Sequence, residues 1–161
     1  MRAAFAGFAV ALLAGCGFHL RGSAQLPFET IYIPGATPLA VELRRNVTAS
    51  SKTRLADSPK NAQAVLAFTQ EAREKVILSF TSAGKVNEYR LRYRVGIRVT
   101  DTAGSQVFLP ASEILLIRDM TFNDQQVIAK ENEEALLYRD MQTDMVQQIM
   151  RRLAAARPQV E

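Results

Sequence analysis

Apolar and polar residues alternate along the middle of the chain. The clearest alternation covers residues 89–99, where apolar residues occupy every second position: Tyr89, Leu91, Tyr93, Val95, Ile97 and Val99. This spacing is typical of an antiparallel strand with one face in the core. Less regular alternation predicts further strands over 64–80 and 106–122. Turn-forming residues at 82–85 and 101–104 separate the three segments, so we expect a meander.

The first of these strands contains a polar interruption at 70–75. Its apolar residues keep one parity on both sides of the interruption: Ala64, Leu66, Phe68, Val76, Leu78 and Phe80. This pattern fits one strand with a bulge, or two strands. Pro110 lies inside the third segment and favours an edge position there, because proline cannot donate a hydrogen bond to a neighbouring strand.

Two other segments have helical spacing. Apolar stripes with a four-residue repeat are formed by Leu39, Leu43 and Val47, and by Leu137, Met141, Met145, Ile149 and Leu153. Thr37 can cap the first helix and Pro38 suits its first turn. With a short strand at 30–33, the order is β-α-β-β-β-α. It predicts an α+β fold, a two-layer sandwich in which two amphipathic helices cover one face of a mostly antiparallel sheet of about four strands.

The N-terminal segment has the layout of a secretory signal. Arg2 precedes an uncharged run from Ala3 to Leu13, and Ala14-Gly15-Cys16 follows. In bacterial lipoproteins, which this arrangement resembles, the cysteine carries diacylglycerol, the peptide before it is removed and the new amino terminus is acylated. We therefore expect residues 1–15 to be a signal peptide, Cys16 to be lipidated and residues 16–25 to form a tether. The alternative is an ordinary signal that leaves a free thiol.

The remaining composition limits the function further. Without residues 1–15 the chain would have 146 residues, which suits one domain over 26–161, and the formal charge would fall from +4 to +3. No second uncharged run approaches the length of about 18 residues that a membrane helix needs. His19 is the only histidine and Cys16 the only cysteine. We expect no metal, no disulfide and no cofactor other than a covalent lipid on Cys16.

Arginines occupy the positions between the apolar residues of the central strand. They are Arg90, Arg92, Arg94 and Arg98. Interrupted only by Gly96, they would form a ridge roughly 27 Å long at about 3.4 Å per residue. Guanidinium groups bind phosphates and carboxylates bidentately, so the ridge is a candidate anion-binding surface, which Lys85 and Lys130 could extend. The alternative is a solvated face whose charge is partly balanced by acids such as Glu71 or Glu113.

Two other classes of function have little support. Tyr89 and Tyr93 could stack on bases, but they share the apolar face and belong to the predicted core, so we expect no nucleic-acid partner. No nucleophile elbow or phosphate-binding loop is present, and the acids of 131–134 fit the solvated face of a helix. We therefore expect no enzymatic activity.

Several motifs resemble the LptE family, the lipopolysaccharide-assembly lipoproteins of the Gram-negative outer membrane. The match begins at Cys16–Gly22 and continues, in order and spacing, at Glu88-Tyr89, at 129–133 and at 151–153. The resemblance implies an outer-membrane lipoprotein anchored in the inner leaflet, on the periplasmic side. It also implies that the chain plugs the lumen of the LptD β-barrel, assists assembly of that barrel and binds lipopolysaccharide during its delivery.

The resemblance also bears on the basic residues. In this family, basic residues near a strand-to-strand turn and at the last helix are associated with lipopolysaccharide binding. Lys130 matches the second position, whereas the turn at 81–85 departs from the family pattern, so that Lys85 is only an approximate counterpart. Two alternatives stay open: a purely structural barrel-assembly lipoprotein whose arginines contact carboxylates of the barrel lumen, or a lipoprotein that binds the cell wall.

Overall fold

The computed structural model describes residues 25–158 of the 161-residue chain. Cys16, the predicted signal peptide and the tether before Gln25 therefore lie outside the described residues. The elements, in chain order, are β1 (Thr30–Tyr32), α2 (Pro38–Ser50), β2 (Arg54–Leu55), the 3-10 turn η1 (Pro59–Asn61), β3 (Ala64–Phe80), β4 (Val86–Thr100), β5 (Val107–Thr121), the 3-10 turn η2 (Asp124–Gln126) and α3 (Val127–Ala155).

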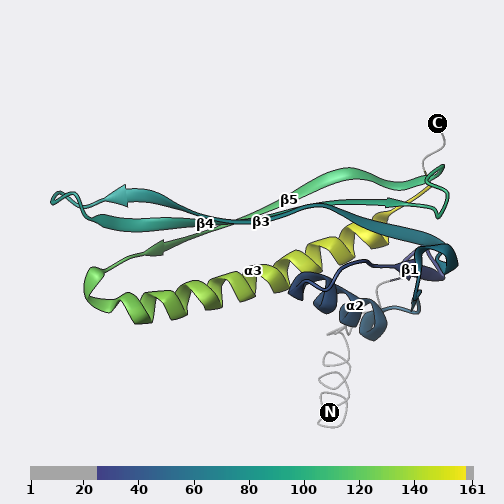
Figure 1. Cartoon of the computed structure of the whole chain (residues 1–161), viewed down its shortest axis with the longest axis horizontal. Coiled ribbons are helices and arrows are strands. Elements are labelled where there is room, and N and C mark those ends of the chain that lie inside the picture. The colour runs from purple at the N-terminus through teal and green to yellow at the C-terminus, as the bar shows by residue number, and fades with distance from the viewer. Residues whose placement is uncertain (1–24, 159–161) are drawn as a thin grey trace, which may run out of the picture.

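One sheet organises the described chain, with the strand order β2-β1-β3-β4-β5. Strands β3, β4 and β5 form a long antiparallel meander, while β1 lies parallel to both β2 and β3. Both helices lie on the same side of the sheet, and α3 runs along most of its length (Figure 1). The α+β class and the one-sided placement of two helices are confirmed, with the two-residue β2 as a fifth strand.

The hydrophobic core lies where both helices meet the sheet. On β4 the predicted apolar row is buried from Leu91 to Val99, and α2 contributes Leu39, Leu43 and Val47. The second half of α3 contributes Met141, Met145, Ile149 and Leu153, which are fully buried. Thr37 caps α2, since its hydroxyl accepts a hydrogen bond from the amide of Ala40 at 3.3 Å. The helical stripes therefore predict the packing of both helices correctly.

A bulge in β3 changes which side chains face the core. The register shifts between Phe68 and Gln70 and again near Ser79. Leu66 pairs with Val99 on the helix side of the sheet, but Val76 pairs with Arg90 on the other side. Of the two arrangements that the sequence allowed, the structure thus has one strand with a bulge, and because the extra residue reverses the alternation, Leu66 and Val76 lie on opposite faces. The side chain of Phe80 is 60% exposed.

Gly96 lies opposite this bulge, which explains why it interrupts the row of arginines. A Cβ atom at Gly96 would collide with Oγ1 of Thr69, the bulged residue, and would lie 3.4 Å from the amide nitrogen of Gln70. The hydrogen of glycine thus leaves room for the Thr69 side chain to lie over the central strand.

Gly96→Ala is therefore expected to destabilise the fold by about 1–3 kcal/mol, the usual cost of overpacking. Urea unfolding measures this loss. Thr69→Ala removes the colliding hydroxyl, so the Gly96→Ala substitution should cost clearly less in that background. Equal costs in both backgrounds would contradict the proposed role of Gly96.

Candidate functional site

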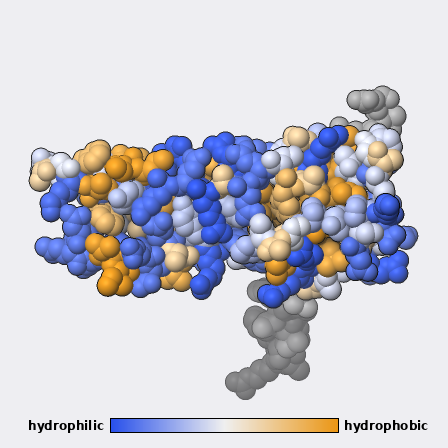
Figure 2. Space-filling view, viewed as in Figure 1, coloured by the Kyte–Doolittle hydropathy of each residue, from blue (hydrophilic) through white to orange (hydrophobic). Residues whose placement is uncertain are grey.

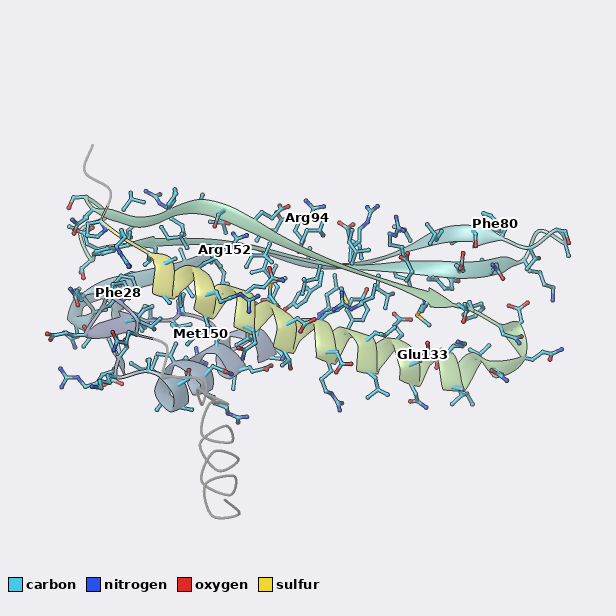
Figure 3. All side chains as sticks on the ribbon, turned by 180° about the vertical axis from the view of Figure 1, so that it is seen from behind. Phe28, Phe80, Arg94, Glu133, Met150 and Arg152 are labelled. Atoms are coloured by element: carbon cyan, nitrogen blue, oxygen red, sulfur yellow. The ribbon has the colours of Figure 1, made fainter. Side chains whose placement is uncertain are left out.

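The predicted arginine ridge lies on the face of the sheet that the helices leave uncovered, as Figure 3 shows for Arg94. Three of its members have carboxylate partners on neighbouring strands. Arg90 donates two hydrogen bonds of 2.8 Å to Asp119. Arg94 donates one of 2.9 Å to Glu113. A longer ion pair of 3.8 Å joins Arg92 to Glu74. Most of the positive charge of the ridge is thus balanced within the same face.

The details of this balance differ from the expected partners. Glu113 neutralises part of the ridge, but Glu71 lies on the helix side, where it accepts a hydrogen bond of 2.8 Å from the Tyr93 hydroxyl. Hydrogen bonds from Arg90 hold the pKa of the Asp119 carboxyl below its ordinary value. Arg98 is exposed and has no ion pair within residues 25–158. An anion-binding role for these arginines stays a prediction.

Lys85 and Lys130 come together at one end of the molecule, formed by the β3–β4 turn, η2 and the start of α3. We call this the distal end, since the described chain begins near the other end (Figure 1). Lys85 forms an ion pair of 3.0 Å with Asp124. Lys130 pairs with Glu133 at 2.8 Å and donates to the Thr121 hydroxyl at 3.1 Å. The Lys130 side chain is only 15% exposed, compared with 68% for Lys85.

Exposed apolar side chains gather at the same end, over both the hairpin and the start of α3 (Figure 2). These distal apolar residues are Ile77, Leu78, Phe80, Val127, Ile128 and Leu136. Ile128 is the most exposed of them, at 77%. Sequence reasoning did not identify this surface, because the apolar alternation at Leu78 and Phe80 does not differ from that of a half-buried strand. The available signal was the polar interruption before Val76, which marks the bulge that turns the row outward.

Polar contacts hold the first half of α3 against the sheet. Lys75 on β3 forms an ion pair of 2.5 Å with Glu134 and lies 4.3 Å from the Tyr89 ring centre. The Tyr138 hydroxyl donates to the Glu74 carbonyl at 2.8 Å. The distal half of the helix interface is therefore polar, whereas the other half is an apolar core.

Tyr93 lies on the helix side of the sheet and stays protonated. Burial, and secondly the hydrogen bond to Glu71, raises the pKa of Tyr93 above its ordinary value.

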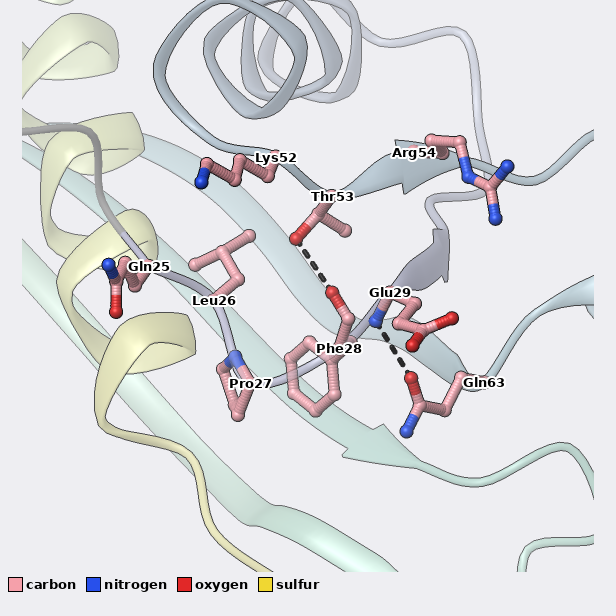
Figure 4. Close-up of a pocket in the computed structure, with 9 residues that line it drawn as sticks. All are labelled: Gln25, Leu26, Pro27, Phe28, Glu29, Lys52, Thr53, Arg54 and Gln63. Atoms are coloured by element: carbon pink, nitrogen blue, oxygen red, sulfur yellow. Dashed lines mark hydrogen bonds between the residues drawn. The ribbon is translucent and has the colours of Figure 1, made fainter.

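A cavity of about 610 Å³ lies at the opposite end, beside Gln25. Its walls come from residues 25–29, 52–54 and Gln63 (Figure 4). The Thr53 hydroxyl donates to the Phe28 carbonyl, and the Glu29 amide donates to the Gln63 side chain, both at 2.8 Å. These bonds join the segment before β1 to the sheet and to the loop after α2.

Within residues 25–158, no group of three histidine, cysteine, aspartate or glutamate side chains is arranged to hold a metal ion. Neither helix in this part of the chain combines the length and apolar character needed to span a membrane.

These features define a small α+β domain whose candidate site is an exposed surface on a long, one-sided sheet. Solved lipoproteins share this fold. The solution NMR structure of an uncharacterized lipoprotein B from Nitrosomonas europaea is 37% identical, with a TM-score of 0.75 over 86% of this chain and 91% of that one. A crystal structure of the rare lipoprotein B from Shewanella oneidensis, 22% identical, has a TM-score of 0.66 over 81% and 94%. The second likeness shows the fold alone.

Sequence comparison identifies the family. Residues 28–153 match the family model LptE, described as Lipopolysaccharide-assembly, and the chain belongs to this family. The LPS-assembly lipoprotein LptE of Photorhabdus laumondii is 29% identical over 91% of this chain and 81% of its own length. The protein of the same name from Pectobacterium atrosepticum is 26% identical over the same shares. The family is one of lipopolysaccharide-assembly lipoproteins of the Gram-negative outer membrane and is not a known enzyme family.

Proposed function

We propose that this protein binds lipopolysaccharide at its distal end while it is seated in the lumen of the LptD barrel. In this proposal Cys16 carries the lipid anchor, and the protein lies on the periplasmic side of the outer membrane. Residues 16–25 serve as the tether that joins this anchor to the domain at residues 26–161. Membership of the LptE family supports the general role in lipopolysaccharide assembly.

One observation carries the binding part of the proposal: the distal end combines ammonium groups with exposed apolar side chains. Lys85 is well exposed, and Phe80 lies five residues before it on the same hairpin. An anionic amphiphile needs both kinds of contact, because its phosphates bind cations and its acyl chains favour apolar surface. The Lys85–Asp124 pair is an exposed contact of modest strength that a phosphate group can replace, and Lys130, although largely buried, pairs with a carboxylate of Glu133 that is itself 45% exposed.

A second observation favours contact between the uncovered sheet face and the barrel wall. On this face the arginine–carboxylate pairs alternate with Val76, Leu115 and Ile117. Leu115 and Ile117 are 42% and 41% exposed. Such a mixture suits a polar lumen wall better than it suits a single anionic ligand, since both signs of charge are present.

The binding assignment is tested with Lys85→Gln and Lys130→Gln together. The double variant should bind purified lipopolysaccharide about ten- to a hundredfold more weakly. Each hydrogen bond to a charged group contributes about 1.5–3 kcal/mol, and water recovers part of this binding energy when the ammonium group is removed. Arg139→Gln, an exposed position on the same helix, is the matched control. Unchanged binding by the double variant would overturn the assignment.

The barrel contact is tested separately with Arg90→Glu, Arg92→Glu and Arg94→Glu together. Affinity purification from detergent-solubilised outer membranes should recover a large β-barrel in stoichiometric amount with the parent chain, and much less of it with this variant. Binding of isolated lipopolysaccharide by the variant should stay intact. If the barrel is recovered unchanged while lipopolysaccharide binding falls, the arginines belong to the ligand site instead.

A further inference from the structure

Unpaired positive charge is concentrated at the end of the molecule opposite the distal end. Residues 25–63 and 145–158 hold eight lysines and arginines but three carboxylates, whereas residues 64–144 hold ten cations and twelve carboxylates. All seven ion pairs of the described chain lie within residues 74–144. Within residues 25–158, the eight cations of the first group therefore have no salt bridge. A formal excess of five positive charges results at this end.

Besides Lys60 and Arg151, three cations of this group are exposed and have no side-chain hydrogen bond within residues 25–158: Arg45, Lys52 and Arg54, which line the pockets at this end. We call them the proximal cations. Arg44, in contrast, donates to the carbonyls of Ile33 and Gly35, so its guanidinium group already has a structural role. The proximal cations come from α2, from the loop after it and from β2, and so form a broad surface without a shared internal partner.

This surface lies where the chain approaches its predicted anchor. Lys52 and Arg54 line the same cavity as Gln25 (Figure 4). Arg45 lines a neighbouring shallow groove on α2 with Val41 and Leu55. Nine residue steps separate Cys16 from Gln25, and a fully extended chain spans at most about 3.6 Å per residue. A lipid on Cys16 would thus keep Gln25, which lines the cavity with Lys52 and Arg54, within about 32 Å of the bilayer.

We propose that the proximal cations dock this end of the domain onto the phosphate groups of anionic phospholipids in the leaflet that holds the anchor. The inference rests on the proposed acylation of Cys16. Exposed cations gain attraction only within about a Debye length of an anionic surface, roughly 8 Å at physiological ionic strength. The tether supplies the proximity, and the absence of internal carboxylate partners within residues 25–158 leaves the charges available.

Docking of this end also sets an orientation. The distal end lies at the far end of the long meander (Figure 1), so contact between the proximal cations and the headgroups directs Lys85 and Phe80 away from the leaflet. The anchor and the cations would then act together: the lipid prevents dissociation, and the charged surface limits rotation about the tether.

Fluorescence energy transfer to a headgroup-labelled lipid tests this arrangement in the acylated full chain. Cys16 is the only cysteine and is blocked by its lipid, so Thr48→Cys on α2 and Ile128→Cys at the distal end each give one labelling position. In vesicles of phosphatidylcholine with phosphatidylglycerol, the label at position 48 should transfer energy efficiently and the label at position 128 weakly. In pure phosphatidylcholine, or at 0.5 M salt (about a 4 Å screening length), the difference should disappear.

Charge variants identify the residues responsible. Arg45→Gln, Lys52→Gln and Arg54→Gln together should lower the ratio of docked to undocked protein about a hundredfold, since each cation near an anionic surface contributes about a factor of five. The matched control removes three cations elsewhere: Lys75→Gln, Arg118→Gln and Arg139→Gln. It should retain the docked signal.

The possible outcomes separate the inference from the proposed function. If the protein does not stay with the vesicles at all, acylation of Cys16 fails and the inference fails with it. If it stays with the vesicles but energy transfer at position 48 is insensitive to phosphatidylglycerol, the anchor holds and the docking is overturned. An equal loss of energy transfer in both charge variants would also overturn the docking and would indicate an effect of net charge. Loss of barrel recovery without any change in energy transfer would overturn it too and would indicate a protein partner for the proximal cations.

Discussion

Ile149→Ala is expected to lower the free energy of unfolding by about 2–5 kcal/mol, whereas Leu137→Ala on the same helix should cost only about 1 kcal/mol. Ile149 is fully buried in the core between α3, α2 and the sheet. Leu137 is partly exposed and packs only at the margin of that core. Urea unfolding of both variants measures the difference. Since small domains are stable by about 5–15 kcal/mol, the first loss is a large fraction of the total free energy of unfolding.

The contrast follows from how α3 is held along its length. Near its C-terminus the helix contacts the sheet through buried apolar side chains, from Met141 to Leu153. Nearer its start it is held by the Lys75–Glu134 ion pair and the Tyr138 hydroxyl bond, which are partly solvated and individually weak. Amide hydrogens of residues 129–137 should therefore exchange faster than those of 145–153, through local opening. Similar exchange rates in both segments would contradict this division of the helix.

Most of the fold could be predicted from sequence periodicity, because the burial of one face of a helix or strand directly determines the spacing of its apolar residues. The two helices and the central strand follow from one apolar face per element, and the edge position of the Pro110 segment follows from the donor that proline lacks. The parallel pairing of β1 could not be predicted in this way. A three-residue strand is too short to carry a pattern, and its position depends on how α2 returns the chain to the sheet.

The surface was harder to predict because pairing across strands depends on register. The sequence places four arginines on one side of β4 but does not say which carboxylates lie opposite. The pairs of Arg90 with Asp119 and of Arg94 with Glu113 depend on the β4–β5 register. The bulge at Thr69 likewise places Val76 opposite Arg90 on the uncovered face of the sheet, whereas Leu66 before the bulge faces the core. One extra residue in a strand thus changes both the core and the candidate site.

Phe80→Ser and Ile128→Ser together are expected to weaken lipopolysaccharide binding about ten- to a hundredfold without a measurable loss of stability. Both side chains are largely exposed, so that their replacement removes little of the folded core. Burial of such side chains against acyl chains contributes about 1.5–3 kcal/mol for each one that is fully covered. If acyl chains cover the two side chains only in part, the lost binding energy corresponds to the expected ten- to hundredfold change in affinity. Binding of fluorescently labelled lipopolysaccharide and urea unfolding measure the two quantities.

The matched control is Leu115→Ser with Ile117→Ser. It makes the same chemical change on the uncovered sheet face, where the two side chains are 42% and 41% exposed. This control should keep its affinity for lipopolysaccharide and lose barrel recovery instead. If it loses lipopolysaccharide binding while the Phe80 and Ile128 variant keeps it, the acyl chains lie along the sheet and not at the distal end.

Lipopolysaccharide without acyl chains separates the two kinds of contact at the distal end. Its phosphates can still bind ammonium groups, but it has no apolar part for Phe80 and Ile128 to cover. The Phe80 and Ile128 variant should therefore bind this deacylated ligand as well as the parent does. The Lys85 and Lys130 variant should bind it more weakly than the parent. Equal losses in both variants would mean that the apolar residues act only by positioning the lysines, because Phe80 precedes Lys85 on one hairpin and Ile128 precedes Lys130 on one helix.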